Sequence, residues 1–141
     1  MFEEFDLKTR EGVEALLRVS PVHNLFEFEL CDLNPETGAL SIRAKTTGDA
    51  ARAYGAEQVH GGVIATLIDC TATFACSVAL NHTVPTMGLH IDFLRPAQGG
   101  EMIASATVRK LGRTVTVVDV EVEAGGKLAA VGRATLASAQ G

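Results

Sequence analysis

The segment that most constrains the fold is residues 61–80, GGVIATLIDCTATFACSVAL, a long apolar run with a single charged residue. On a helical wheel at about 100° per residue, its large apolar side chains gather in one arc of roughly 140°. This arc consists of Val63, Ile64, Leu67, Ile68, Phe74, Ala75 and Val78. We expect a helix here, with this arc packed on a sheet.

The second face of this helix carries small and hydroxyl residues and one carboxylate. A solvated face would favour Lys, Arg, Glu or Gln instead. The members of this face are Gly62, Ala65, Thr66, Asp69, Ala72, Thr73 and Cys76. Small side chains let another surface approach closely, and one sheet cannot cover both faces of a helix. We therefore expect a partner subunit or a ligand on this face, and infer a homodimer.

Alternating strand patterns surround the helix. Two runs within residues 23–47 precede it, joined by a turn at residues 34–38. Four more runs follow, over residues 86–94, 101–111, 113–123 and 127–138, and their hairpin-length connections predict antiparallel neighbours.

A short amphipathic helix is predicted over residues 8–19. The order of elements predicts an α+β fold in which an antiparallel β-sheet wraps around the long central helix. We expect one domain over residues 1–141, with an N-terminal helical segment at residues 1–20.

Composition limits the possible partners. The formal net charge of −5 argues against a nucleic-acid surface, which needs clustered positive charge. No run reaches 18 uninterrupted apolar residues, so we expect no membrane span. The first 20 residues begin acidic and lack the apolar core of a secretory signal, so we expect a cytoplasmic protein.

The cysteines do not predict disulfides. Cys31, Cys70 and Cys76 are odd in number and lack the spacing of a disulfide framework, so we expect reduced thiols, buried at Cys70 and Cys76. The four histidines form no cluster with zinc-site spacing. We expect neither a metal nor another cofactor.

Asp69 is the only charged residue of the long helix. A lone carboxylate in a covered helix costs free energy unless it is hydrogen-bonded or used in chemistry. One interpretation is structural, with Thr66, Thr73 or backbone amides holding the carboxylate. The other is catalytic, and the helix alone does not distinguish the two.

The motif His60-Gly61-Gly62 leads directly into the helix. Glycines are poor helix formers, so two of them at a helix start need a reason. They leave backbone N–H groups open to a close ligand, and the helix dipole adds to the attraction for negative charge. An oxyanion would suit this place. The alternative is a simple turn into the helix.

Gly61 and Asp69 are eight residues apart, about 12 Å along a helix axis. From one chain they cannot both contact the same reacting carbon atom. A two-fold dimer with antiparallel central helices would pair Asp69 of one chain with Gly61 of the partner subunit and create two equivalent sites.

Three segments resemble one family, the hotdog-fold acyl-CoA thioesterases. They are VHGGVIATLIDCTATFA, TMGLHIDFLRPAQGGE and VRKLGRTVTVVDVEV, and they are most similar to the PaaI-type branch of phenylacetate degradation. The resemblance covers about residues 20–137. It implies a hotdog fold, dimers that often pair into tetramers, and hydrolysis of a thioester, usually of CoA.

Residue roles follow from the resemblance by position. It implies Asp69 as general base or nucleophile, the Gly61 amide as oxyanion donor, and Thr86 as a hydroxyl that holds the carboxylate or water. This branch often has Asn or Gln six residues before the His, where this chain has Tyr54, so Tyr54 or Gln58 would supply that contact.

The remaining candidate site residues have three possible roles: a base, contacts to the substrate, and contacts to the CoA phosphates. His60 is a base or, in the other interpretation, orients the loop. On the helix, Gly62, Thr66 and Thr73 would contact substrate. The basic hairpin of the family implies that Arg109, Lys110 and Arg113 hold CoA phosphates, and the same role is possible for Arg95. The alternative is that these residues form a solvated turn.

The sequence therefore predicts hydrolysis of aryl- or medium-chain acyl-CoA. One alternative is a non-catalytic hotdog module that binds acyl-CoA. Another is a hotdog enoyl-CoA hydratase, which is disfavoured because Phe74 occupies the place where that chemistry would use His. A Ser-His-Asp hydrolase lacks its G-x-S-x-G motif, and no P-loop or dinucleotide fingerprint is present.

Overall fold

The computed structural model describes residues 5–139. Its helices are α1 (Arg10–Leu16) and α2 (Gly61–Leu80), with short 3-10 segments η2 (Pro21–Leu25) and η3 (Gly48–Ala50). Its strands are β1 (Phe26–Leu33), β2 (Leu40–Thr46), β3 (Thr86–Phe93), β4 (Glu101–Lys110), β5 (Val115–Ala124) and β6 (Lys127–Ala137). The N-terminal helix is shorter than the predicted 8–19.

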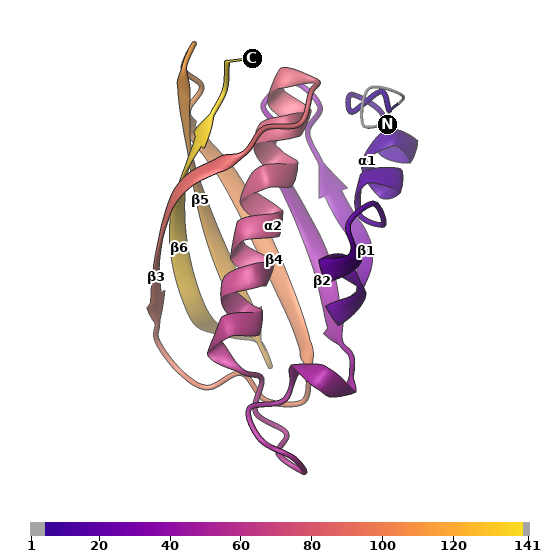
Figure 1. Cartoon of the computed structure of the whole chain (residues 1–141), viewed down its shortest axis with the longest axis vertical. Helices are drawn as coiled ribbons and strands as arrows, with labels where there is room; N and C mark the ends of the chain where they lie inside the picture. The colour runs from indigo at the N-terminus through magenta and orange to yellow at the C-terminus, as the bar shows by residue number, and fades with distance from the viewer. Residues whose placement is uncertain (1–4, 140–141) are drawn as a thin grey trace.

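One antiparallel sheet curves around α2, as Figure 1 shows. The strand order is β1-β2-β4-β5-β6-β3, so β1 and β3 end the sheet. This arrangement confirms the predicted α+β class with a sheet wrapped around a long helix. The core lies between the inner face of the sheet and the apolar arc of α2.

The apolar arc of α2 is buried as predicted, from Val63 at 8% exposure to Leu67 and Ile68 at 0%. By length and composition α2 would be able to cross a membrane, but 67% of its apolar window is buried in the fold. Such burial is typical of the core helix of a globular domain. The apolarity of α2 is therefore explained by packing on the sheet.

Two residues of the second face of α2, the face that we expected a partner or ligand to cover, are instead buried by the chain's own sheet. Ala72 and Cys76 have 0% exposure, although the wheel places them on the side of Asp69. The sheet continues past the helix on the side of β5, β6 and β3, where the Cys76 thiol contacts Thr116 of β5. The part of the second face that the sheet leaves uncovered is therefore narrower than predicted, because a helical wheel does not represent the curvature of the sheet.

The predicted pairing of the last four strands is wrong at one position. β4 pairs with β5 and β5 with β6, as expected. However, β3 pairs with β6, for example Ile91 with Gly132, while β4 pairs with β2. The connection between β3 and β4 crosses the end of the sheet, turning at Gly99 and Gly100 with positive φ. This crossing places β3 at an edge beside α2.

Two glycines let the sheet approach α2 closely. A Cβ on Gly132 of β6 would lie 2.6 Å from Ile68 Cγ2. A Cβ on Gly38, in the turn between β1 and β2, would lie 2.3 Å from the Ala75 backbone oxygen, and the φ of Gly38 is +84°. At both positions a side chain would push α2 away from the sheet.

The N-terminal segment is fastened to the C-terminal end of α2. The Lys8 ammonium donates to the carbonyl oxygens of Ala79 (3.0 Å) and Pro35 (2.8 Å). The Leu7 amide donates to Oδ1 of Asn81 (2.8 Å), the left-handed residue that ends α2. A cation at the C-terminal end of a helix also interacts favourably with the helix dipole. These contacts hold the C-terminal end of α2 against the N-terminal segment and the turn between β1 and β2.

We predict that Gly38→Ala lowers the free energy of unfolding by about 2–4 kcal/mol, because a left-handed backbone and a clash with main chain combine. Urea unfolding measures the change. Gly48→Ala is the matched control, since it has open space and an ordinary φ. Equal stability of the two variants would contradict the packing described here.

Candidate active site

The Asp69 carboxylate is held from one side by a hydroxyl of β3. Thr86 Oγ1 donates to Asp69 Oδ1 at 2.6 Å. Thr73 Oγ1 donates to the Asp69 backbone oxygen at 2.9 Å and lies 3.3 Å from Thr86 Oγ1. Among residues 5–139, Thr86 is the only hydrogen-bond donor to the carboxylate. The second oxygen, Oδ2, is therefore left for another group.

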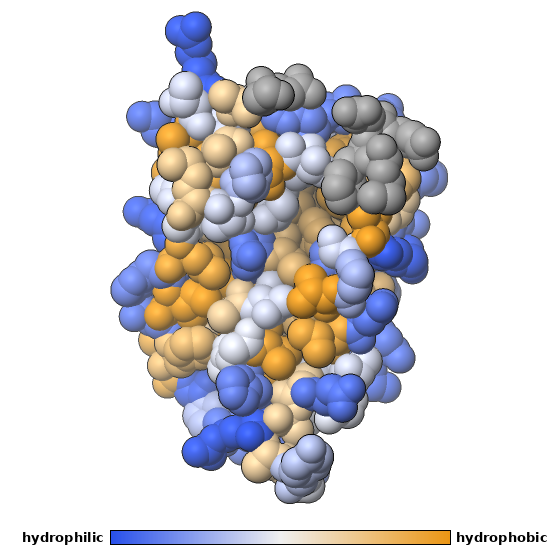
Figure 2. Space-filling view, in the orientation of Figure 1, coloured by the Kyte–Doolittle hydropathy of each residue, from blue (hydrophilic) through white to orange (hydrophobic). Residues whose placement is uncertain are grey.

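Asp69 lies on a strip of α2 that the sheet leaves open. The strip consists of Gly62, Ala65, Thr66, Asp69 and Thr73, which are exposed or partly exposed. Thr66 does not hold the carboxylate, because its hydroxyl donates to the Gly62 carbonyl at 2.9 Å. Figure 2 shows this face, with strongly apolar surface over β3 and on the opposite side of α2, and a paler strip between them over α2 itself. The strip is thus lined by small and hydroxyl side chains around a single carboxylate.

The first turn of α2 leaves one amide free. The His60 carbonyl accepts from Val63 N (2.9 Å) and Ile64 N (3.2 Å). The His60 ring Nδ1 accepts from Gly62 N at 2.9 Å. Within the described residues, the Gly61 N–H has no acceptor. It sits at the positive end of a 20-residue helix, where an anion is stabilised.

A groove of about 370 Å³ opens beside Gly61 and includes Gln58, Phe93 and Arg95 in its wall. The Phe93 ring lies 3.6 Å from where a Cβ on Gly61 would be. A backbone hydrogen bond from Val59 to Ala97 (2.9 Å) joins the two sides of the groove, and one from Leu94 to Ala129 (2.8 Å) ties the Phe93 side to β6. Sequence reasoning missed Phe93, although it immediately precedes the Leu94-Arg95-Pro96 segment.

Several predicted substrate residues lie away from this groove in one chain. Tyr54 is fully exposed in the loop before the His60 motif. Lys110, the last residue of β4, and Arg113 just after it are exposed about 30 Å along the strand from its start near the groove. Within one subunit they do not meet Gly61, and a role with CoA phosphates would require a second subunit.

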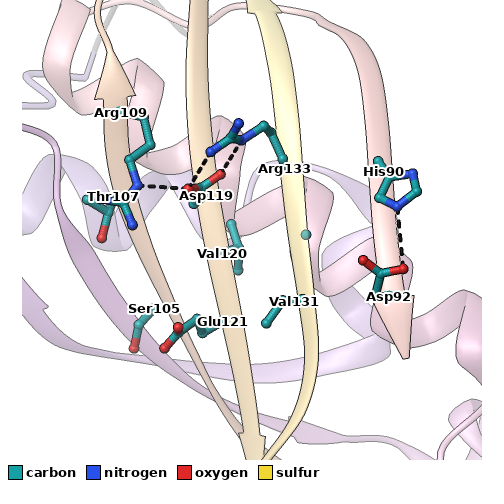
Figure 3. A pocket seen from close by; sticks show the side chains of 11 residues that line it. His90, Asp92, Ser105, Thr107, Arg109, Asp119, Val120, Glu121, Val131 and Arg133 are labelled. Atoms are coloured by element: carbon teal, nitrogen blue, oxygen red, sulfur yellow. Dashed lines mark hydrogen bonds and ion pairs between the residues drawn. The ribbon is translucent and has the colours of Figure 1, made fainter. Parts of the chain in front are cut away.

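Arg109 lies on the outer face of the sheet. Figure 3 shows it with Arg133 on either side of Asp119, in a hollow of about 350 Å³. Arg109 Nε and Arg133 Nε lie 2.7 and 2.6 Å from the Asp119 carboxylate. Val118 and Val120, its neighbours on β5, point into the core, so this cluster is on the opposite face from Asp69. Sequence analysis predicted no such cluster.

The Asp119 cluster gives a pH prediction. Hydrogen bonds from Arg133, then Arg109, lower the pKa of Asp119 to about 2 from 3.8. A lowered folded-state pKa stabilises the fold above pH 3.8, and this stabilisation is lost as pH falls toward 2.

We predict that Asp119→Asn lowers the thermal midpoint slightly at pH 7, and that the difference from wild type disappears near pH 2. Thermal unfolding across this pH range measures it. Because the arginines are exposed, the effect is small. A difference that persists unchanged at pH 2 would contradict the ion-pair origin.

The buried thiols give a second prediction. Burial, with the nearby Asp69 charge, raises the pKa of Cys70 to about 12. Burial also raises the pKa of Cys76 to about 11. At pH 8 we expect a thiol reagent to modify Cys31, which is half-buried, and to reach the other two after denaturation. Mass spectrometry of the labelled native and urea-unfolded chains tests this, and rapid native labelling at Cys70 would contradict it.

Comparison with known proteins identifies the family. Residues 57–130 match the model of the Thioesterase superfamily, and the chain belongs to this family. A protein from Halobacterium salinarum, provisionally named an esterase, is 42% identical over 72 residues, which is 48% of this chain and 47% of that protein. A similarly named protein from Haemophilus influenzae is 37% identical over 82 residues, 55% of this chain and 59% of its own length. The matches thus span about half the length of these relatives.

Solved structures confirm the hotdog fold. A phenylacetic acid degradation-related protein from Ralstonia eutropha JMP134, provisionally named a thioesterase, superposes with a TM-score of 0.78 and 27% identity, over 89% of this chain and 98% of the other. A thioesterase from Haemophilus influenzae gives 0.78 and 26%, over 92% and 89%. The predicted resemblance to PaaI-type hotdog thioesterases is confirmed.

Within the described part of the chain, no group of three His, Cys, Asp or Glu side chains could hold a metal ion. The donor groups at the candidate site are one carboxylate, hydroxyls and a backbone amide. This set can take a proton from water or attack a carbonyl, and it can stabilise an oxyanion. These are the functions that thioester hydrolysis requires.

Proposed function

We propose that the chain hydrolyses acyl-CoA thioesters at two equivalent sites, each shared between two copies of the chain. The observation that carries the proposal is the complementarity of two incomplete half-sites on α2. One is a fixed carboxylate with a free oxygen at Asp69. The other is an amide without an acceptor at Gly61, about 12 Å along the helix.

Antiparallel packing of two α2 helices would join the half-sites. Asp69 of one chain would then face Gly61 of the partner subunit, and two-fold symmetry would repeat the arrangement. The open strip of small residues on α2 supports close approach. The strip has no lysine or arginine that would have to be desolvated.

The edge strand β3 also supports the dimer. Its outer edge ends the sheet, and its Met87 and Phe93 side chains are 63% and 54% exposed. An exposed strand edge with large apolar side chains favours pairing with another strand. Pairing β3 with its copy would place the two α2 helices side by side on one continuous sheet. Two such dimers would form the tetramer that we also propose.

The reaction follows from the two half-sites. The thioester carbonyl oxygen binds the Gly61 amide, which stabilises the oxyanion as the tetrahedral intermediate forms. Asp69 takes a proton from a water whose oxygen bonds to the carbonyl carbon, or attacks that carbon itself to form an anhydride that water then cleaves. The carbon–sulfur bond breaks, the acid is released, and the CoA thiolate takes up a proton.

CoA as the thiol component is supported by the family and by the fold. A protein from Streptococcus mutans with a TM-score of 0.69 and 24% identity was solved bound to acetyl CoA, which supports CoA as the group bound here. The groove beside Gly61 has an apolar side formed by Ile64, Phe93 and Leu94. We propose that an aryl or medium-chain acyl group binds against it.

The direct test is release of free thiol from a panel of aromatic, short, medium and long acyl-CoAs, with wild type and Asp69→Ala side by side. We expect release by the wild type and a loss of at least about 100-fold in the variant. Circular dichroism and gel filtration confirm that the variant stays folded and assembled. Tight acyl-CoA binding without release by the wild type would instead establish a binding module.

Gly61 allows a test of the oxyanion donor with a matched control. Proline is tolerated at the first position of a helix and lacks the N–H, and His60 already has the extended backbone (φ −62°, ψ 137°) that precedes proline. We predict that Gly61→Pro lowers kcat about 100- to 1000-fold, the cost of removing one oxyanion donor.

Gly61→Ala keeps the amide hydrogen and places its Cβ at ordinary contact distance from Phe93. We therefore expect Gly61→Ala to lose less activity than Gly61→Pro and to be at least as stable as wild type. If the two variants have equal kcat values, the Gly61 amide is not the donor.

A further inference from the structure

We infer that His60 is a positioning residue: its ring caps the first turn of α2 and thereby directs the Gly61 amide toward the substrate, without acting on the reactants itself. This inference rests on the proposed thioesterase function. It chooses between the two sequence interpretations of His60, a base and a residue that orients the loop.

The hydrogen bonds of the first turn carry the inference. A helix starts with four N–H groups that have no partner within the helix. His60 supplies an acceptor for two of them, its carbonyl oxygen for Val63 N (2.9 Å) and its ring Nδ1 for Gly62 N (2.9 Å), and a third, its own N–H, donates to the Ala50 carbonyl. The remaining N–H belongs to Gly61. His60 therefore determines which amide of the turn is free for a ligand.

The packing of Gly62 supports the same conclusion independently. A Cβ on Gly62 would lie 3.1 Å from His60 Nδ1 and 3.3 Å from its Cε1, tighter than ordinary contact. The ring thus lies directly over the Gly62 backbone. A Cβ on Gly61 would meet only the Phe93 ring, at an ordinary 3.6 Å. The packing of the His60 ring therefore explains why residue 62 is glycine. The glycine at residue 61 has no such explanation and leaves room for a ligand to approach closely.

The backbone holds the His60 ring in this position. The His60 amide donates to the Ala50 carbonyl at 2.9 Å, which ties the residue to η3. The preceding residue, Val59, is buried and donates to Ala97 on the other side of the groove. With both sides fixed, the extended conformation of His60 directs its ring back over the helix start.

The cap also limits the chemistry of the ring. Because Nδ1 accepts the Gly62 hydrogen, the neutral ring carries its own hydrogen on Nε2. Nδ1 cannot take a proton from water while the cap is in place. With Nδ1 engaged and Nε2 protonated, the ring has no free lone pair with which to act as a base, which argues against the base interpretation of His60.

The test compares His60→Ala with His60→Asn. Asparagine is among the best N-cap residues, because its side-chain oxygen accepts from the same amide, but it has no imidazole. Thiol release gives kcat and KM for each variant. Amide hydrogen exchange over residues 62–64 reports the cap directly and does not depend on turnover.

We expect His60→Ala to lower kcat about 10- to 100-fold with little change in KM, and to speed amide exchange at residues 62–64. We expect His60→Asn to recover kcat to within about threefold of wild type and to restore slow exchange. An Asn variant with slow exchange but activity as low as Ala would overturn the inference, because the imidazole would then act on the reactants.

The exchange measurement separates this inference from the proposed function. If the wild type releases no thiol from any acyl-CoA, the thioesterase proposal fails, while slow exchange in His60→Asn and fast exchange in His60→Ala still establish the cap. If exchange is the same in all three proteins, the cap does not order the turn. The inference about His60 then fails even if the wild type is active.

Discussion

The rest of the structure depends on the packing of the apolar arc of α2 into the curved sheet. This packing fixes how α2 is rotated about its axis, because Leu67 and Ile68 are fully buried on one side. The rotation in turn leaves Asp69 on the strip that the sheet does not cover. The close approach at Gly38 and Gly132 leaves little room for α2 to turn or slide. A core contact thus sets the position of the candidate catalytic carboxylate.

The same rotation links the two ends of β3 to the two half-sites. Thr86, at the start of the strand, donates to the Asp69 carboxylate, and Phe93, at its end, lies beside Gly61. At about 3.3 Å per residue, the seven steps from Thr86 to Phe93 cover about 23 Å, against about 12 Å of helix between Gly61 and Asp69, so the strand reaches past both half-sites. One edge strand therefore aligns both half-sites for a second chain.

Much of this arrangement was predictable from the sequence. The 3.6-residue period of residues 61–80 predicted the buried arc, and strict alternation predicted β5, where Val118, Val120 and Val122 face the core. The pairing of β3 with β6 was missed, because connection length does not show which edge of a sheet a strand joins. Burial of Ala72 and Cys76 was missed because it depends on sheet curvature.

The site was predictable only in outline. The spacing of Gly61 and Asp69 predicted a shared site, whereas the role of Thr86 came from family resemblance and not from spacing. The contact between His60 Nδ1 and the Gly62 amide depends on a side-chain direction that the sequence does not contain. The cluster at Asp119 joins three strands, so its partners became evident only from the register of β4, β5 and β6.

The central claim is that each site takes Asp69 from one chain and Gly61 from another, and subunit mixing tests it most directly. Inactive Asp69→Asn and Gly61→Pro proteins would be mixed in equal amounts, unfolded and refolded together, and assayed for thiol release. Random pairing makes half of the dimers mixed, and each mixed dimer has one intact site. The account predicts recovery of about a quarter of wild-type activity. A mixture that stays as inactive as its two parents would show that the site is not shared in this way.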